Sequence, residues 1–210
     1  MKLYPINLDI AGKLCTVIGG GEVALRKIRG LLQVEAVVRV IAPEVCAEVE
    51  ELFQRGEIFL TREKFSADML GDEILLIAAT DNPEVNRQAA ESARAKKILA
   101  NVAEGAGGNF FVPSRITRGD LLLTISTGAN SPAFARFVRL MLEAELDDKI
   151  GAGLELIARR RAEVKRLLPD ANARKNFWRE VLTPDLWQLL RKGQLDALNQ
   201  LLDTALAQRT

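Results

Sequence analysis

The chain has 210 residues, of which 48% are hydrophobic and 27% are charged, as is usual for a globular protein with a substantial core. Its 29 basic and 28 acidic residues leave a formal net charge of +1, so no global charge favours nucleic acid or an anionic membrane as a partner. Histidine is absent, which removes the usual general base at neutral pH and the commonest metal ligand.

The two cysteines, Cys15 and Cys46, form no CxxC motif or other close pair. The sequence therefore predicts neither a disulfide framework nor a metal site. The first residues, MKLYPINLDIAGK, lack the continuous apolar core of a signal peptide, and no run of about 18 apolar residues occurs. We expect a cytoplasmic protein that binds neither membrane nor nucleic acid.

Between residues 13 and 102, short apolar segments alternate with helical ones. This alternation indicates βαβ units and a parallel sheet with helices on both faces, the α/β architecture of a Rossmann domain. The predicted strands are Leu14–Ile18, Val37–Ile41, Ile58–Leu60, Ile74–Ala79 and Ile98–Val102, and the predicted helices are Glu22–Gln33, Glu44–Arg55 and Glu84–Lys96.

The pattern changes after Val102. Two further strands are predicted at Phe110–Val112 and Leu121–Ser126, and Ser131-Pro132 is a good start for a helix. Residues 150–208 carry only helical patterns, broken at prolines and a glycine. We expect three domains: a nucleotide-binding Rossmann domain at 1–112, a small strand-helix module at 113–148 and a helical C-terminal domain at 149–210.

The segment Gly19-Gly20-Gly21-Glu22-Val23-Ala24 fits the pattern G-x-G-x-x-[GA], directly after a predicted strand and at the start of a predicted helix. In that context the glycines allow a tight turn and a close approach of the backbone to a pyrophosphate at the helix N-terminus. The alternative is a tight turn without a ligand. The surrounding βαβ pattern favours a dinucleotide site.

The end of the second predicted strand bears on the choice of cofactor. Many NAD sites have an acidic residue there to hold the ribose hydroxyls. Here Ala42 occupies that position, Glu44 follows two residues later, and no arginine follows to receive a 2′-phosphate. We therefore expect NAD in preference to NADP.

Polar residues also end the fourth and fifth predicted strands, at Thr80, Asp81 and Asn101. Ligands of open α/β sheets bind at the carboxyl ends of the strands, so these residues are candidates for cofactor contact. The alternative is local turn chemistry, because Asp81-Asn82-Pro83 would also cap the next helix.

Several separated motifs occur in a fixed order along the first 145 residues. The motifs are Leu3–Ile6, Gly19–Lys27, Ala78–Pro83 with Asn86, Asn101–Val102, Phe110–Pro113 and Ser126–Pro132. This order resembles that of precorrin-2 dehydrogenase, the N-terminal part of siroheme synthase, and a generic Rossmann domain would lack the later motifs.

The resemblance implies a dehydrogenase that transfers hydride from precorrin-2, a reduced tetrapyrrole, to NAD and so forms sirohydrochlorin. It also implies a homodimer with its interface in the module at 113–148, and two strands alone would be too few for stability. Some relatives also insert iron into sirohydrochlorin. Because the chain has no histidine and its cysteines are isolated, we assign no metal site for that activity.

The resemblance further implies that Glu22 and Val23 lie against the cofactor and that Pro43 and Glu44 lie near the adenosine ribose. The candidate catalytic carboxylate of the family is an aspartate shortly after the Asn-Val pair. Here Glu104, one methylene longer, follows in a loop about one residue shorter than usual.

Glu104 also suits the chemistry. Loss of hydride from the macrocycle leaves a cation that must release a proton, and a nearby carboxylate can accept that proton or stabilise the charge. The alternative is a solvated loop glutamate.

The carboxylates of precorrin-2 call for a basic site, and arginine suits bidentate carboxylate binding. The candidates for substrate contact are Arg115, Arg118, Thr127 and Ser131. For each arginine the alternative is a solvated residue or a dimer contact, and for Thr127 it is a turn residue.

Two other functions fit part of the sequence. Another small NAD-dependent oxidoreductase fits the first 102 residues equally well but leaves the Ser126–Pro132 segment unexplained. A non-enzymatic nucleotide-sensing Rossmann domain needs neither the carboxylate nor a basic cleft.

Overall fold

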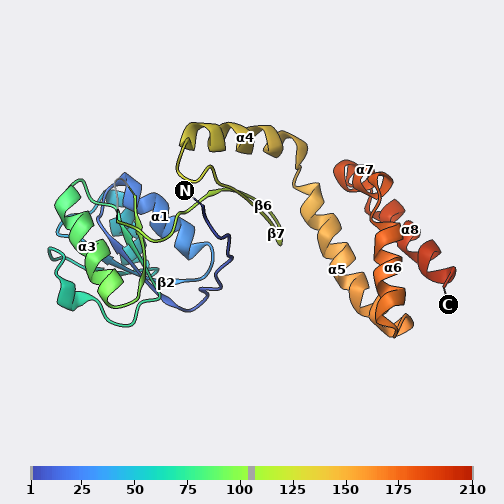
Figure 1. The fold of residues 1–210 in the computed structure, drawn as a ribbon, viewed down its shortest axis with the longest axis horizontal. Helices are drawn as coiled ribbons and strands as arrows, with labels where there is room; N and C mark the ends of the chain where they lie inside the picture. Colours follow the sequence, from blue (N-terminus) through green and yellow to red (C-terminus); the bar gives the residue numbers. More distant parts are fainter. Residues whose placement is uncertain (1, 104–106, 210) are drawn as a thin grey trace. The chain divides into compact units, whose positions relative to one another are not determined.

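A computed structural model of the chain describes residues 2–103 and 107–209. They form two compact units, one of Tyr4–Val112 and one made mainly of the residues from Pro113 onward. Figure 1 shows the α/β unit in blue to green and the remaining strands and helices in yellow to red.

The first unit contains a parallel five-stranded sheet with the strand order β3-β2-β1-β4-β5. Its central strand β1 pairs with β2 on one side and with β4 on the other, so that Ile18 lies beside both Ile41 and Ala78. The predicted α/β fold of the Rossmann type is confirmed. The strands are β1 (Leu14–Ile18), β2 (Val37–Ile41), β3 (Phe59–Thr61), β4 (Leu75–Ala78) and β5 (Leu99–Val102).

Helices cover both faces of this sheet because the strands are apolar on both sides. Cys15 and Val17 of β1 face a core that includes residues of α1 and α2, whereas Ile18 faces a second core that includes residues of α3 and Leu70, which follows the short helix η1. The helices are α1 (Glu22–Leu32), α2 (Ala47–Gln54), η1 (Ala67–Met69) and α3 (Pro83–Ala95).

One buried polar cluster interrupts the second face. The Glu73 side chain is fully buried, accepts hydrogen bonds from Thr16 Oγ1 (3.0 Å) and the Gly71 N–H (2.7 Å), and forms an ion pair with Arg39. Arg39 also donates to the carbonyl of Met69 (2.9 Å). A buried charge is tolerated when it is paired and hydrogen-bonded in this way. The cluster therefore ties β1 and β2 to the segment that leads into β4.

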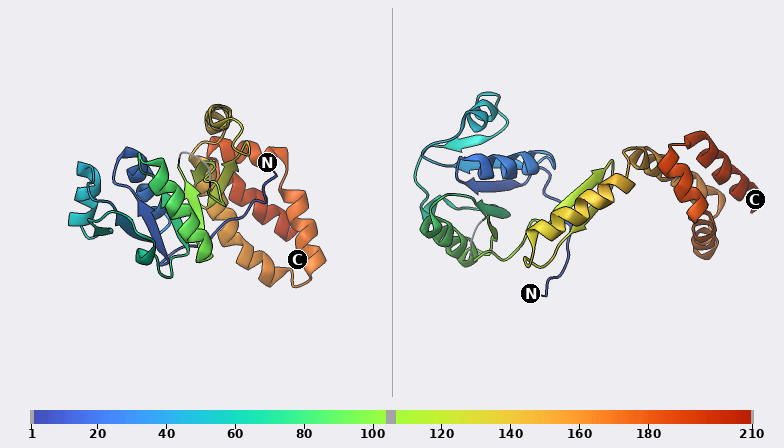
Figure 2. Two further views of the ribbon diagram at one scale, coloured as in Figure 1. Left: turned by 60° about the vertical axis from the view of Figure 1, so that its left-hand side comes forward. Right: turned by 90° about the horizontal axis from the view of Figure 1, so that it is seen from above.

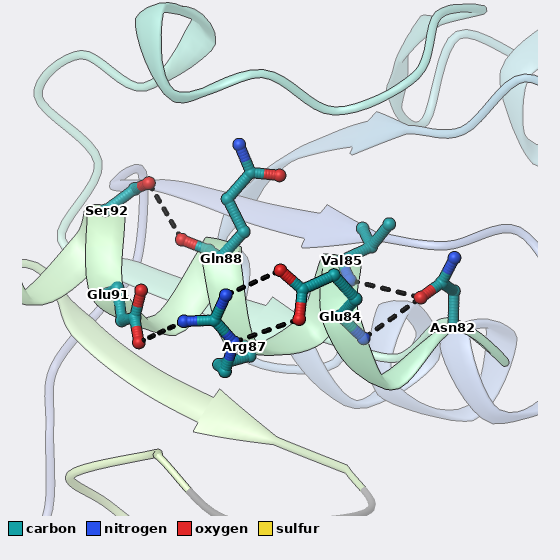
Figure 3. A network of polar contacts seen from close by, with 7 residues as sticks. All are labelled: Asn82, Glu84, Val85, Arg87, Gln88, Glu91 and Ser92. Atoms are coloured by element: carbon teal, nitrogen blue, oxygen red, sulfur yellow. Dashed lines mark hydrogen bonds and ion pairs between the residues drawn. The ribbon is translucent and has the colours of Figure 1, made fainter.

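Helix α3 has clear local start signals. The Asn82 side chain accepts hydrogen bonds from the Glu84 and Val85 N–H groups, and Pro83 occupies the first helical position (Figure 3). On the exposed side of the helix, Arg87 lies between Glu84 and Glu91 and pairs with both, which lowers the pKa of the Glu84 carboxyl. These contacts fix the first turns of the helix that follows β4.

The second unit consists of an antiparallel hairpin followed by five helices. Helix α4 packs along the hairpin, and the other four helices pack on one another around Phe177 and Leu198 (Figure 2). The division of this unit at residue 148 stays a prediction. Its elements are β6 (Ser114–Arg118), β7 (Leu121–Ile125), α4 (Pro132–Glu145), α5 (Lys149–Leu167), α6 (Ala171–Val181), α7 (Pro184–Lys192) and α8 (Leu195–Ala207).

Two sequence predictions need correction. The strand predicted at Phe110–Val112 is wrong: the partner of β7 is Ser114–Arg118, and residues 109–110 bond to β5 instead. The helix predicted from Glu44 begins only at Ala47, because Cys46 is extended (φ −68°, ψ 163°) and its N–H donates to the carbonyl of Gly20 (2.8 Å).

None of the helices in the described residues is both long and apolar enough to cross a bilayer.

Candidate nucleotide-binding site

The glycine turn joins β1 to α1, and its close contacts require glycine at two positions. Gly19 has φ +116°, and a Cβ atom there would lie 2.3 Å from the carbonyl oxygen of Ala79. A Cβ atom on Gly20 would lie 2.3 Å from the carbonyl oxygen of Glu44 and 2.6 Å from Val45 Cγ1. The turn is therefore held between the ends of β2 and β4.

Gly21 differs from its two neighbours. A Cβ atom there would meet nothing within 4 Å, so the turn is open at this residue. Gly21 is the N-cap of α1 and supplies no side-chain cap, and the first helical hydrogen bond runs from the Leu25 N–H to its carbonyl (2.9 Å). Among the described residues, no backbone acceptor is recorded for the N–H groups of Glu22, Val23 and Ala24. Unpaired N–H groups at a helix N-terminus can hold a phosphate.

Of the two predicted cofactor residues in the first turn of α1, Glu22 is exposed and Val23 is half-buried against the core. The negative charge of Glu22 interacts favourably with the positive end of the helix dipole, but it would repel a phosphate. Its side chain therefore suits a place beside the pyrophosphate more than a direct contact.

The end of β2 lies beside the same turn. Ala42 is buried and donates its N–H to the carbonyl of Thr61 (3.1 Å), which continues the pairing with β3. The next two residues, Pro43 and Glu44, are exposed, and the carbonyl of Glu44 touches Gly20. The chain thus brings the Glu44 region to the glycine turn, where an acidic side chain can hold ribose hydroxyls.

The end of β4 is held by Asn86, which is 3% exposed. The Asn86 side chain accepts from the Thr80 N–H (3.1 Å) and Oγ1 (2.8 Å), and its Nδ2 donates to the Thr80 carbonyl (2.9 Å). Asp81 beside it is exposed. The sequence places Asn86 in a motif but predicts no role for it. In the structure, Asn86 holds the backbone of Thr80, which lies next to Gly19.

The end of β5 carries Asn101, which is 6% exposed. Its Nδ2 donates to the carbonyl of Phe110 (3.0 Å), whereas its Oδ1 is buried and has no hydrogen-bond partner among the residues that the structure describes. Glu104, the predicted catalytic residue, lies outside the described residues. Ten of the eleven predicted cofactor and catalytic residues therefore lie together at the carboxyl ends of β1, β2, β4 and β5.

The four predicted substrate residues belong to the second unit. Arg115 is exposed on β6, whereas Arg118 pairs with Asp148 (3.1 Å) and donates to the carbonyl of Leu146 (2.6 Å). Thr127 Oγ1 bonds to both the N–H and the carbonyl of Ser131 (3.1 Å each), and Ser131 Oγ caps α4 at the Phe134 N–H. These contacts also stabilise the local structure around Arg118, Thr127 and Ser131.

The described residues contain one group of side chains with metal-ligand character. Carboxylate oxygens of Glu22 and Glu48 and the Cys46 sulfur all lie within 4.8 Å of one another at the N-termini of α1 and α2. Cys46 is isolated in the sequence, and its proximity to the two glutamates arises only because β2 brings α2 beside the glycine turn.

The two thiols are expected to differ in reactivity. Cys15 is fully buried in β1, and burial raises the pKa of its thiol to about 11, so almost no thiolate forms at neutral pH. Cys46 is only half-buried, beside the glycine turn. A thiol reagent should modify Cys46 alone in the native protein, and NAD should slow that reaction.

Mass spectrometry of the labelled chain checks this expectation. A Cys46→Ser control should stay unlabelled until denaturant is added, when Cys15 reacts. Rapid labelling of Cys15 in the native protein would contradict it.

Family profiles match most of the chain. Residues 6–114 match a family described as putative NAD(P)-binding, and residues 149–206 match the sirohaem synthase dimerisation region. The first match spans just over half of the chain and covers the whole sheet with its glycine turn.

Two siroheme synthases illustrate the similarity to curated proteins. The enzyme from Photorhabdus laumondii is 34% identical over 209 residues, which are 99% of this chain and 44% of that protein. The enzyme from Chromobacterium violaceum is 36% identical over 194 residues, 92% of this chain and 41% of that protein. The chain thus spans less than half the length of the curated relatives it matches.

A solved structure matches both units. The protein described as "SirC, precorrin-2 dehydrogenase" superposes with a TM-score of 0.78 at 26% identity, over 97% of this chain and 98% of that one. The profile match across the nucleotide-binding unit establishes that the chain belongs to the putative NAD(P)-binding family, and over almost its whole length it is similar to siroheme synthases and to a precorrin-2 dehydrogenase.

Proposed function

We propose that this chain oxidises precorrin-2 to sirohydrochlorin with NAD, as a step of siroheme synthesis. The observation that carries the proposal is the likeness to a precorrin-2 dehydrogenase over almost the full length of both chains. A different dehydrogenase or a nucleotide sensor would need only the first unit. The two cysteines are free thiols, which suits the reducing cytoplasm expected from the sequence.

The glycine turn fits the cofactor. Gly19 and Gly20 allow the backbone to pass close to β4 and β2, and the open side at Gly21 leaves room for a pyrophosphate over the N-terminus of α1. Glu44 would hold the adenosine ribose, and the loops at Thr80 and Asn101 would flank the nicotinamide half. Hydride acceptance is the chemistry that NAD would supply when bound there.

The chain must then accept a proton, since the oxidation removes one hydride and one proton from the macrocycle. We assign this role to Glu104, which follows β5 by two residues in the sequence. A carboxylate near the ring both stabilises the cation left by the hydride and takes the proton as a carbon–hydrogen bond breaks.

For the substrate, the proposal relies on Arg115, Arg118, Thr127 and Ser131. Arg115 offers an exposed guanidinium for a substrate carboxylate, and the capped N-terminus of α4 at Ser131 has a favourable dipole for an anion. Because Arg118 already pairs with Asp148, its main role is to stabilise the hairpin.

The test of the function is direct. Purified chain is mixed with precorrin-2 and NAD, and the sirohydrochlorin spectrum is followed together with NADH absorbance. Equal appearance of sirohydrochlorin and NADH supports the proposal. NAD binding without turnover would point to a nucleotide sensor, and turnover of other substrates alone would point to another dehydrogenase.

NAD should bind more tightly than NADP. The exposed Glu44 carboxylate suits free ribose hydroxyls and repels a 2′-phosphate. Calorimetric titration should give a lower Kd for NAD, and Glu44→Gln should reduce the preference by weakening NAD and strengthening NADP. Equal or tighter binding of NADP by the unmodified chain would sink this assignment.

The chain should form a homodimer through α4. Four apolar side chains on this helix are exposed, namely Phe134 at 57%, Phe137 at 57%, Leu140 at 45% and Met141 at 58%, and the two aromatic rings lie 6.1 Å apart. Such a large exposed apolar face marks an interaction surface. Sedimentation should give twice the chain mass of 23.1 kDa at micromolar concentration.

The location of the interface is testable as well, because the family's dimerisation region matches residues 149–206 and the sequence analysis expected residues 113–148. Phe137→Glu should yield monomers if α4 forms the interface. Trp187→Glu, at a 38% exposed residue on α7, is the matched variant for the other region and should leave the dimer intact. The reverse result would move the interface to the helical region.

A further inference from the structure

A single peptide group packs against the glycine turn on the β4 side. A Cβ atom on Gly19 would lie 2.3 Å from the carbonyl oxygen of Ala79, 2.8 Å from its carbonyl carbon and 3.2 Å from the amide nitrogen of Thr80. All three atoms belong to the peptide that joins Ala79 to Thr80. On the β2 side, the Gly19 N–H donates to the carbonyl of Ile41 (3.0 Å). The position of the Ala79–Thr80 peptide therefore limits where the turn can lie.

The side chain of Asn86 holds this peptide in place. Its Oδ1 accepts a hydrogen bond from the Thr80 N–H (3.1 Å), and its Nδ2 donates to the Thr80 carbonyl (2.9 Å). One carboxamide thus serves both backbone groups of Thr80, as a neighbouring strand would. Asn86 belongs to the first turns of α3 and is 3% exposed, so water cannot readily replace it. The start of α3 and the end of β4 are therefore joined behind the glycine turn.

The hydroxyl group of Thr80 takes part in the same network. Its Oγ1 lies 2.8 Å from Asn86 Oδ1 and 3.1 Å from the Asn82 carbonyl oxygen, and both of these atoms can accept its single proton. The hydroxyl oxygen in turn accepts a hydrogen bond from the Asn82 N–H (3.2 Å). The hydroxyl of this predicted cofactor residue is thus already hydrogen-bonded within its own loop. Its contacts suit a residue that fixes the loop more than one that binds the cofactor directly.

We propose that Asn86 is a positioning residue for the nucleotide, which acts through the backbone of Thr80 to keep the glycine turn in its NAD-binding conformation. The inference rests on the proposed function and deepens it, because it names the residue that forms the cofactor site before NAD arrives. A protein that takes its binding conformation only a tenth of the time binds about tenfold more weakly. Removing the Asn86 amide should therefore weaken NAD binding without removing any atom that touches NAD.

The experiment compares Asn86→Ala with Asn82→Ala by calorimetric NAD titration and thermal unfolding. Asn82 is the matched control, because its side chain caps the same helix at Glu84 and Val85 but makes no bond to the Thr80 backbone (Figure 3). Both variants should lower the Tm by about 2–8 °C. Only Asn86→Ala should raise the Kd for NAD about tenfold, whereas Asn82→Ala should change it less than about threefold.

Normal NAD affinity in Asn86→Ala, or a loss no larger than that of Asn82→Ala, would overturn the proposal, because the amide would then serve stability alone. Thr80→Val separates positioning from direct contact. It keeps the size of the side chain and both backbone bonds to Asn86 but removes the hydroxyl, so the Kd for NAD should change less than about threefold. A loss as large as that of Asn86→Ala would mean that the hydroxyl touches the cofactor, and the positioning role would fall.

Hydrogen exchange of the unmodified chain keeps the test decisive if Asn86→Ala folds poorly. Without NAD, the Thr80 amide should be protected within about tenfold of the Ala79 amide, which donates to Ile18 inside the sheet (2.8 Å). Exchange at Thr80 more than about 100-fold faster than at Ala79 would show that Asn86 does not hold the loop, and would overturn the proposal. A chain that binds no NAD would mean that the proposed function itself has failed, and the exchange at Thr80 would still test the hold of Asn86.

Discussion

Replacing Glu104 by Gln should lower the rate of precorrin-2 oxidation by about 10²- to 10⁴-fold, the usual contribution of a general base. The variant keeps the size of the side chain and removes its charge and its ability to accept the proton. The Kd for NAD should stay within a few fold, since the proposed cofactor site lies mainly at the glycine turn. Single-turnover absorbance measurements of sirohydrochlorin formation check the prediction.

Glu104→Asp is the informative control, because an aspartate is the residue that the family resemblance expects at this place. It should retain most of the activity if the carboxylate is what matters and the loop can absorb one methylene. Near-normal turnover in Glu104→Gln would mean that the proton leaves by another route, such as water or Asp120. Loss of NAD binding in Glu104→Gln would instead make the residue part of the cofactor pocket.

Replacing Gly20 by Ala should abolish measurable NAD binding and destabilise the α/β unit. The new Cβ atom would overlap the Glu44 carbonyl and Val45, which are backbone and core atoms that cannot move aside without opening the turn. Overpacking of this kind costs about 1–3 kcal/mol or more in the free energy of unfolding. Calorimetric NAD titration and thermal unfolding measure the two effects.

Gly21→Ala is the matched control. The Cβ atom at Gly21 would meet nothing within 4 Å, so the fold should lose no more than about 1 kcal/mol from the poorer N-cap. NAD affinity should nevertheless fall at least tenfold, because the new methyl group occupies the space given to the pyrophosphate. Normal NAD affinity in Gly21→Ala would contradict that placement of the cofactor.

The sequence was sufficient for most of the α/β unit because its signals are local. Each of the five strands is a short apolar run, and Asn82 and Pro83 indicate the start of the helix after β4. The start of α2 was missed because it depends on a tertiary contact: Cys46 is extended and donates its N–H to the Gly20 carbonyl, so the helix begins at the next residue.

The hairpin was misread for a similar reason. Phe110–Val112 is the more apolar segment and has strand-like composition, but the Asn109 and Phe110 N–H groups are taken by Ala100. The true strand β6 shows the alternation expected of a half-exposed strand, with only Ile116 buried, and turns into β7 at Gly119, which has φ +56°.

The candidate site shows the same difference between local signals, which the sequence reveals, and tertiary contacts, which it does not. The glycine turn was predictable because its spacing is set by the backbone geometry of one βα junction. The roles of Asn86 and Asn101 were not, because each depends on a bond to a residue in another segment, Thr80 or Phe110. Only the folded chain shows that these two amides serve the backbone.

The hydrogen bonds between residues 109–110 and β5 also bear on how the protein avoids aggregation. The open edges of a sheet are templates for pairing with another chain. Here Ala100 has both of its backbone groups bonded to Asn109, and the opposite edge strand, β3, is only three residues long. An extended chain that approached β5 would have to displace Asn109 before it could add to the sheet. The hydrogen bonds of Asn109 and Phe110 to β5 therefore also shield the sheet from edge-to-edge association.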